Sequence, residues 1–160
     1  MKFRKSYPSL LLLFIGAVLS AQVEIDDQGL YYDADGKLFS GTYIEFYSNG
    51  NRRIELSLNE GQIDGTVILY FDHGVKREIR SYRMGMMDGT WITWNEEGIK
   101  IAQASYLKNQ KHGDWFIWDD EGTLRFEMHY TKGYKTGLWR MFNEKGELVS
   151  EENKGDSPGP

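Results

Sequence analysis

The residues of this sequence that could do chemistry are three histidines and a few acidic clusters. His73, His112 and His129 are the only histidines, and their spacing is not that of a metal site, so we interpret them as structural surface residues. Asp26-Asp27 and the stretch 33–36 resemble the start of a calcium loop, but no glutamate follows at the twelfth position. We therefore expect ordinary turns at these aspartates and no bound metal.

A third acidic cluster and the absence of other reactive groups argue against catalysis. Asp119, Asp120 and Glu121 are adjacent, but the equivalent turn elsewhere in the chain reads Ser-Asn or Glu-Lys, which favours a solvated loop. The sequence contains no serine or cysteine nucleophile with a plausible base, no glycine-rich phosphate loop and no pair of catalytic carboxylates in distinct environments. The sequence therefore predicts a protein that is not an enzyme and uses no cofactor.

Aromatic side chains are the one feature of the sequence suited to binding. The candidate binding residues are Tyr43, Trp91, Trp94, Trp115, Trp118 and Trp139, which include every tryptophan. Two interpretations remain open: the rings form the core of a thin sheet, or some of them anchor a partner. Trp115 and Trp118 have opposite parity along one predicted strand, so they should face opposite sides unless a bulge intervenes. One aromatic column is then exposed.

These aromatic residues are positioned by a sequence repeat with a period of 24 residues. Each unit begins with a glycine and has a second glycine at its tenth position, after a turn that contains Asx or acidic residues. We interpret these ten as structural glycines: Gly41, Gly65, Gly89, Gly113 and Gly137 lead the units, and Gly50, Gly74, Gly98, Gly122 and Gly146 close the turns. So strict a period indicates a repeat protein.

Each unit is predicted to be a β-hairpin. Aromatic and β-branched residues bounded by turn residues indicate a first strand, and the second strand alternates apolar and polar residues, as in Phe126-Met128-Tyr130 against Arg125-Glu127-His129. One face of the second strands should then be buried and the other solvated. Glu78 and Arg80 interrupt this alternation, and we expect them to form an exposed cross-strand ion pair.

Successive hairpins should add edge to edge. The connections pass through Gly61, Gly85, Asn109 and Gly133, and asparagine at this position indicates a positive φ, which glycine and asparagine tolerate best. The expected fold is all-β: an elongated, twisted, single-layer antiparallel β-meander built of about five 24-residue hairpins. The turn glycines should also have positive φ, as in a type I turn followed by a bulge.

The N-terminus has the pattern of a secretory signal peptide over residues 1–21. Lys2, Arg4 and Lys5 precede an apolar run at 10–19 that ends on Ser20-Ala21. Ten apolar residues make only about 15 Å of helix, too short for a membrane anchor. We expect cleavage before Gln22 and export to a bacterial periplasm or the medium. Because the sequence has no cysteine, the exported protein should be neither disulfide-bonded nor lipid-anchored.

The remaining chain divides by the repeat. We expect a capping segment at 22–40, because a terminal repeat has a face without a neighbour. Residues 41–150 form the five repeats, and 151–160 are expected to be a disordered tail. The predicted units are 41–64, 65–88, 89–112, 113–136 and a partial unit at 137–150.

Charge excludes two classes of partner. The full sequence carries a formal net charge of -5, and removal of three basic residues with the signal peptide would lower the net charge to -8. An acidic protein repels phosphate backbones and anionic headgroups. We therefore expect no nucleic-acid partner and disfavour an anionic membrane.

The motif Tyr-x-x-Gly-x-x-x-Gly-x-Trp-x-x-Phe-x-x-x-Gly occurs in phase along the chain. One copy comprises Tyr130, Gly133, Gly137, Trp139, Phe142 and Gly146, and looser copies begin at Tyr82 and Tyr106. Over 41–150 the chain thus resembles the MORN repeat variant, and in particular the bacterial YwqK-type antitoxin family. The resemblance implies a β-hairpin repeat fold. It also implies toxin binding or phospholipid binding as functions.

The predicted function is an exported, non-enzymatic MORN-like repeat module for protein–protein binding or scaffolding at the bacterial cell envelope. The alternatives are an antitoxin- or immunity-type binder of a toxin protein, and a module for glycan or peripheral lipid binding. Exposed tryptophan faces would suit either a protein partner or sugar rings. The sequence leaves the oligomeric state open.

Overall fold

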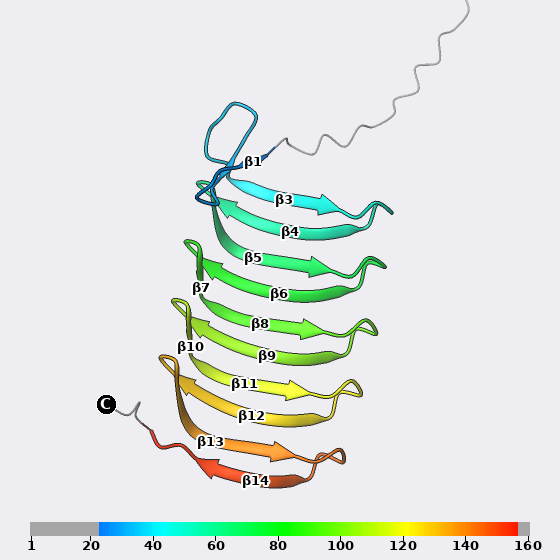
Figure 1. The fold of residues 1–160 in the computed structure, drawn as a ribbon, viewed down its shortest axis with the longest axis vertical. Helices are drawn as coiled ribbons and strands as arrows, with labels where there is room; N and C mark the ends of the chain where they lie inside the picture. Colours follow the sequence, from blue (N-terminus) through cyan, green and yellow to red (C-terminus); the bar gives the residue numbers. More distant parts are fainter. Residues whose placement is uncertain (1–22, 157–160) are drawn as a thin grey trace, which may run out of the picture.

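The computed structural model describes residues 23–156, and the expected signal peptide lies outside them, as do residues 157–160. Figure 1 shows one elongated sheet in which hairpins follow one another from the N-terminal to the C-terminal end. All regular structure in the described residues is β-strand. Accordingly, the described residues include no helix suited to crossing a membrane. The predicted all-β antiparallel meander is confirmed.

The sheet path runs through ten strands in sequence order, with two short strands attached to its side. The path consists of β3 (Gly41–Phe46), β4 (Arg52–Asn59), β5 (Gln62–Tyr70), β6 (Lys76–Arg83), β8 (Gly89–Trp94), β9 (Lys100–Leu107), β11 (Gly113–Trp118), β12 (Leu124–Thr131), β13 (Tyr134–Phe142) and β14 (Leu148–Asn153). The attached strands are β7 (Met86–Met87) on β6 and β10 (Gln110–Lys111) on β9. Neighbouring strands are antiparallel throughout.

The hairpin turns, at the right in Figure 1, contain the predicted glycine and bulge. In the hairpin of β11 and β12, the Gly122 N–H donates to the Asp119 carbonyl, and Gly122 has a φ of 86°. The strand register then shifts by one residue between Ile117 and Trp118. The same shift occurs in all five hairpins. Because the extra residue lies on the second strand, the alternation of faces along the first strand is not interrupted.

The connections, at the left in Figure 1, are two-residue turns in which both residues have positive φ. Asn109 has a φ of 67°, as predicted, but the preceding Lys108 also has a positive φ, of 48°. The pairing of Leu107 with Gln110 closes this turn. Two successive positive φ values define a type I′ hairpin turn, whose twist matches that of the sheet. The sequence revealed only the second of the two residues.

The leading glycines are required because neighbouring backbones approach closely. A Cβ atom built on Gly65 would lie 2.9 Å from the Cβ of Ser57, and one on Gly89 would lie 2.9 Å from the Cβ of Ser81. Both glycines also have positive φ. Each therefore lets the first strand of a unit lie close beside the second strand of the preceding unit.

The segment before the first repeat packs on one end of the sheet. Its strands β1 (Glu24–Ile25) and β2 (Tyr31–Tyr32) pair with each other, and the Tyr31 N–H donates to the Gly61 carbonyl. Under this segment lies the most buried cluster of the described residues, formed by Leu56, Leu58 and Val67. Tyr31, Phe39 and Tyr43 are among the residues that pack against it. The segment is thus a cap over an aliphatic core.

The last strand differs from its predecessors in sequence and corrects one expectation. We predicted disorder from residue 151, but β14 continues to Asn153, and the Lys154 N–H donates to the Gly137 carbonyl. The apolar residues of β12 are replaced in the last unit by Ser150 and Glu152 on β14 and by Lys154 directly after it. Charged residues on an edge strand oppose pairing with another sheet.

Candidate functional site

One face of the sheet carries a continuous ladder of aromatic rings. Tryptophans from first strands alternate with tyrosines from second strands, at centroid separations between 4.7 and 5.8 Å. The ladder comprises Tyr82, Trp91, Tyr106, Trp115, Tyr130 and Trp139. The rings lie in tilted or edge-on arrangements, which aromatic quadrupoles favour. We expected equivalent rings of successive hairpins to stack directly, whereas in the structure a tyrosine lies between each pair of tryptophans.

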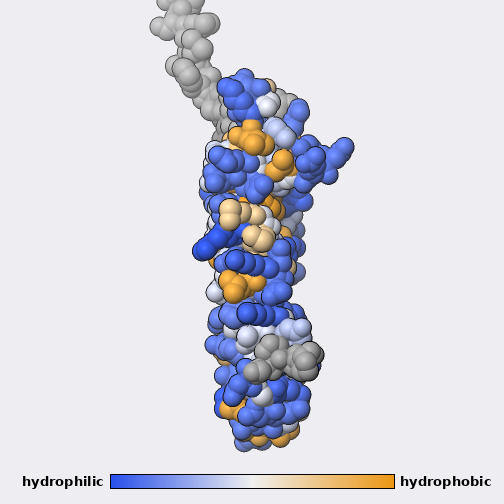
Figure 2. Space-filling model, turned by 90° about the vertical axis from the view of Figure 1, so that its left-hand side faces the viewer, coloured by the Kyte–Doolittle hydropathy of each residue, from blue (hydrophilic) through white to orange (hydrophobic). Residues whose placement is uncertain are grey.

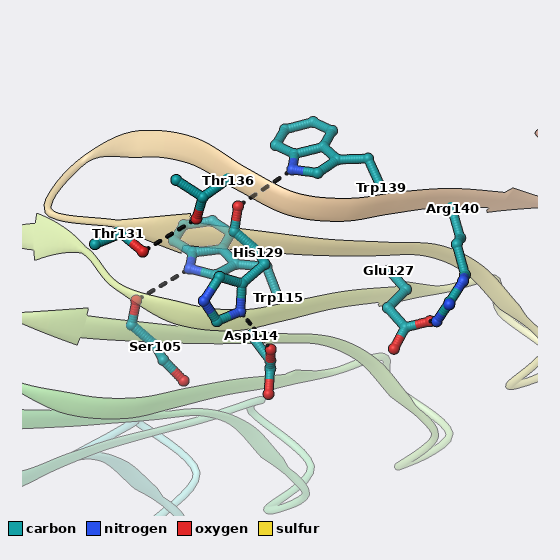
Figure 3. Close-up of polar contacts among 9 residues, drawn as sticks. All are labelled: Ser105, Asp114, Trp115, Glu127, His129, Thr131, Thr136, Trp139 and Arg140. Carbon is teal, nitrogen blue, oxygen red and sulfur yellow. Dashed lines mark hydrogen bonds and ion pairs between the residues drawn. The ribbon is translucent and has the colours of Figure 1, made fainter. Parts of the chain in front are cut away.

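The ladder tryptophans are fixed by hydrogen bonds to the preceding unit. The indole N–H of Trp115 donates to the Ser105 carbonyl at 3.0 Å, and that of Trp139 donates to the His129 carbonyl at 3.1 Å (Figure 3). Trp91 makes the equivalent bond to Ser81 at 3.3 Å. Each bond links one unit to the next and leaves the indole without a donor for a ligand. These three tryptophans therefore serve mainly to hold the repeats together.

Cationic side chains cover parts of the ladder. The Lys111 ammonium lies 4.3 Å from the Trp115 ring centroid, and the Lys135 ammonium lies 4.5 Å from that of Trp139. Arg80 lies 5.1 Å from the Trp91 centroid and pairs with Glu78. The expected exposed cross-strand pair is thus wrong, because Glu78 and Arg80 are two residues apart on β6 and only partly exposed. Arg80 occupies an apolar position because the indole face accepts its charge.

The second aromatic column lies on the opposite face, as the strand parity predicted. The rings of Phe116 and Trp118 are 5.7 Å apart, which places these alternate residues on one side of β11, away from the ladder residue Trp115. Trp94 is equivalent to Trp118 in the preceding unit. Hydrogen bonds from the Trp94 and Trp118 indoles are absent from the described part of the chain, in contrast to the three ladder tryptophans. Their N–H groups are available to a ligand.

A row of apolar residues runs beside this second column. Strand register places Ile79 between Ile68 and Ile92, and Phe116 beyond Gln103 of β9. We define the isoleucine–tryptophan strip as Ile68, Ile79, Ile92, Trp94, Phe116 and Trp118. Each of these side chains is partly exposed. The predicted division into a buried face and a solvated face is therefore wrong here, because a single layer leaves both faces open and both carry apolar residues.

Charged residues bound the strip at both ends. Beyond Phe116 the same row continues with Glu127, Arg140 and Glu151. Arg140 lies 3.0 Å from Glu127 (Figure 3) and 2.7 Å from Glu151. The hydrogen bonds that Arg140 donates to Glu151 and, to a smaller extent, to Glu127 raise the Arg140 pKa. At the other end Glu55 precedes Ile68 in the row. An apolar centre with a charged rim is the anatomy of a protein interface.

The histidines and aspartates that might have indicated chemistry have structural contacts. His129 lies 2.7 Å from Asp114 on the sheet surface (Figure 3), and the His73 ring bonds the Glu96 carbonyl of the next turn. Asp26 and Asp33 accept N–H bonds from residues two and four positions later, which are the Asx turns that we predicted. The bond from Leu30 is the main cause of a lowered Asp26 pKa. Within 23–156, no group of three metal-binding side chains is found.

The sequence did not reveal the role of the tyrosines and lysines on the ladder face, or that of Ile79 on the opposite face. The ladder tyrosines recur every 24 residues, and this period is visible in the sequence. Their position between the tryptophans is visible only in the structure. Lys111 and Lys135 recur in only two units, and Ile79 stands at a position that is charged or polar in the other units. Among the named binding residues, Tyr43 lies beside the cap, where its ring is 6.0 Å from that of Tyr31.

Comparison with known families supports the repeat assignment. The MORN repeat variant matches residues 111–132, which extend from β10 through β12. A search of curated proteins finds no match to the chain. The hairpin within residues 111–132 is thus similar to a MORN repeat variant, and the same hairpin fold recurs along the sheet. MORN repeats generally serve as non-catalytic modules, commonly for binding.

Proposed function

We propose that this chain is an exported, non-enzymatic repeat module that binds another protein through the isoleucine–tryptophan strip. The observation that carries the proposal is the contrast between the two tryptophan columns. Trp91, Trp115 and Trp139 donate to backbone carbonyls of the preceding unit, whereas Trp94 and Trp118 lie beside partly exposed isoleucines without such a bond. Tryptophans of this kind commonly dominate the energy of protein interfaces.

The chemistry around the strip also favours a protein partner. The Lys100 ammonium lies 4.1 Å from the Trp118 centroid and 3.3 Å from the Gln103 amide oxygen. Gln103 lies within the strip, between Ile92 and Phe116. Lys100 and the Arg140 cluster lie beside it, and all these polar groups can pair with the backbone and side chains of a partner. The leader-like residues 1–21 favour export. A toxin as the partner would make the chain an immunity- or antitoxin-type binder, in line with the YwqK-type resemblance.

The test is site-specific photo-crosslinking of the full chain in cells. A photoreactive phenylalanine analogue replaces either Ile92, on the strip, or Thr93, the next residue on the same strand, which faces the ladder. We expect one discrete protein adduct from position 92 and little or none from position 93. Fractionation of the same cells should place the adduct outside the cytoplasm.

Affinity measurements with the captured partner complete the test. Replacing Trp94 and Trp118 together with alanine should weaken binding by roughly several hundred-fold, since interface tryptophans commonly contribute about 2 kcal/mol each and about 1.4 kcal/mol corresponds to a factor of ten. The matched control is Trp139→Phe, which alters the ladder and should leave binding unchanged. Equal adducts from positions 92 and 93, or undiminished binding by the double variant, would contradict the proposal.

Glycan binding is a second candidate, favoured by one specific observation. Trp94 and Trp118 are equivalent residues two strands apart, and Lys100, on the strand between them, pairs with Trp94 in the register and lies over the Trp118 ring. Two indole platforms with a polar group between them suit consecutive sugar rings of an extended chain. Saturable quenching of tryptophan fluorescence by peptidoglycan fragments, lost in the Trp94→Ala, Trp118→Ala variant, would favour this candidate over a protein partner.

A further inference from the structure

The connections lie along one long side of the sheet, where the strands end, and the charge of this side changes along its length. The first connection carries Glu60 and Asp64 and the second carries Arg83 and Asp88, whereas the next two carry Lys108, Lys111, Lys132 and Lys135. We define the basic edge as these four lysines together with Lys154. Figure 2 looks onto the connection side of the molecule, where hydrophilic residues cover most of the C-terminal half.

The opposite edge has the opposite charge. The last three hairpin turns carry seven acidic residues and one basic residue, Lys145; the acidic residues are Glu96, Glu97, Asp119, Asp120, Glu121, Glu144 and Glu147. The C-terminal units are thus basic along the connections and acidic along the hairpin turns. The overall net charge of -5 therefore conceals a cationic surface that can attract an anionic ligand.

Two lysines of the basic edge hold their charges above the aromatic ladder. The Lys111 ammonium, which lies over Trp115, is also 4.9 Å from the ring centroid of Tyr130. The Lys135 ammonium lies 4.5 Å from the ring centroid of Trp139. Neither lysine takes part in any ion pair of residues 23–156. The rings hold both ammonium groups in place without neutralising them, so the charges are preorganised for an anion.

The spacing of these charges selects the shape of the ligand. Lys111 and Lys135 are equivalent residues of successive units, two strands apart, which is about 9.6 Å along the sheet. A polyproline II helix has three residues per turn and advances about 9.3 Å per turn. An acidic residue at every third position would therefore place one carboxylate beside each ammonium.

We propose that the ladder face of the two C-terminal units binds an acidic polyproline II segment of another protein, lying across the strands along the basic edge. Charge complementarity and the matching period specify this ligand. Aromatic surfaces are also the usual docking sites for polyproline II segments. A shallow pocket of about 290 Å³ beside Trp139 offers apolar contact for the prolines through Phe126, Met128 and Met141. Arg140, Ser150 and Glu152 complete its lining, and Glu152 is paired with Lys154. This surface lies on the opposite side of the sheet from the isoleucine–tryptophan strip.

The experiment measures fluorescence anisotropy of a labelled peptide that repeats Glu-Pro-Pro, titrated with the full chain. We expect saturable binding that weakens as salt is added. The Lys111→Gln, Lys135→Gln variant should bind about tenfold more weakly, as expected for two surface ion pairs. The Lys111→Arg, Lys135→Arg variant should restore binding. The matched control is Lys37→Gln, Lys145→Gln, which removes the same charge away from the ladder and should bind like the unmodified chain.

Further peptides and variants test the period and separate the two proposed surfaces. A peptide of the same composition with its glutamates grouped together should bind several-fold more weakly, because it cannot reach both lysines from one face. Equal binding of the grouped peptide, absence of binding, or stronger binding of a single-stranded oligonucleotide would overturn the proposal. The Trp94→Ala, Trp118→Ala variant should bind the peptide normally, so failure of the strip proposal leaves this result unaffected.

Discussion

The ladder face is built in two different ways at the two ends of the sheet. At the N-terminal end, Leu56, Leu58 and Val67 are only 3–5% exposed, because the capping segment lies over them. At the C-terminal end, nothing among the described residues covers the sheet in this way, and Phe126 and Met141 are 41% and 39% exposed. The same 24-residue unit therefore supports both a buried aliphatic core and an open aromatic surface.

The difference shows what a single layer of strands needs for stability. Aliphatic side chains stabilise by leaving water, so they need a second layer above them. Aromatic rings also contact one another edge to face, accept cations and donate N–H bonds, so they can link neighbouring strands while partly exposed. The C-terminal units use these interactions in place of a cap. Their surface is consequently left open for partners.

The largest expected effect tests the covered end of the comparison. Replacing Leu56 with alanine should lower the free energy of unfolding by about 2 to 5 kcal/mol, because the change leaves a cavity under the cap. Replacing the exposed Met141 with alanine is the matched control at the open end and should cost far less. Urea denaturation followed by circular dichroism measures both values. Similar losses in the two variants would mean that the cap does not bury its core.

An intermediate effect separates the two tryptophan columns. Trp115→Ala removes two ring contacts at 5.2 Å and the bond to Ser105. Trp118→Ala removes one ring contact and one lysine contact. The first variant should therefore be less stable than the second by roughly 1 to 2 kcal/mol in urea denaturation. A Trp118→Ala variant less stable than Trp115→Ala would show that the second column, and not the ladder, stabilises the sheet.

The smallest expected effect concerns alkaline pH at the open end. Burial among the ladder rings raises the Tyr106 pKa above its usual value of about 10. The neutral phenol is then favoured in the folded chain, so its contribution to stability is fully present below about pH 10 and is lost as the pH rises through the folded pKa. We expect the melting temperature to fall more steeply in that range than it does for Tyr106→Phe. Identical profiles would show that this ring does not couple ionisation to folding.

Much of the fold was predictable because the repeat constrains it. The period of 24 residues gave the hairpins, and the glycines gave the positive φ values and the bulged turns. The predictions that were wrong concern the C-terminal end of the sheet and the burial of its two faces. Alternation in Phe126-Met128-Tyr130 indicates a buried face, but burial depends on a covering layer that only the first repeats receive. The strand at 151–153 was missed because its residues lack an apolar face, although backbone pairing with β13 suffices to order it.

The candidate site was predictable in part. Strand parity placed Trp115 and Trp118 on opposite faces, since side chains of a strand alternate. Parity does not reveal which indole N–H donates a hydrogen bond to a backbone carbonyl, because the acceptor of Trp115 is Ser105 on a neighbouring strand. The positions of Lys111 and Lys135 over the rings were equally hidden, as they depend on contacts between units.

The sequence by itself determined the class of fold, the order of the hairpins and the positions that require glycine, because these follow from local conformation repeated at a fixed interval. The tertiary structure alone decided which apolar residues are covered, which tryptophans are fixed and where the positive charges gather. Those properties arise between strands that are neighbours in space but belong to different units. The two proposed binding surfaces are therefore products of stacking the units, and a single unit would present neither.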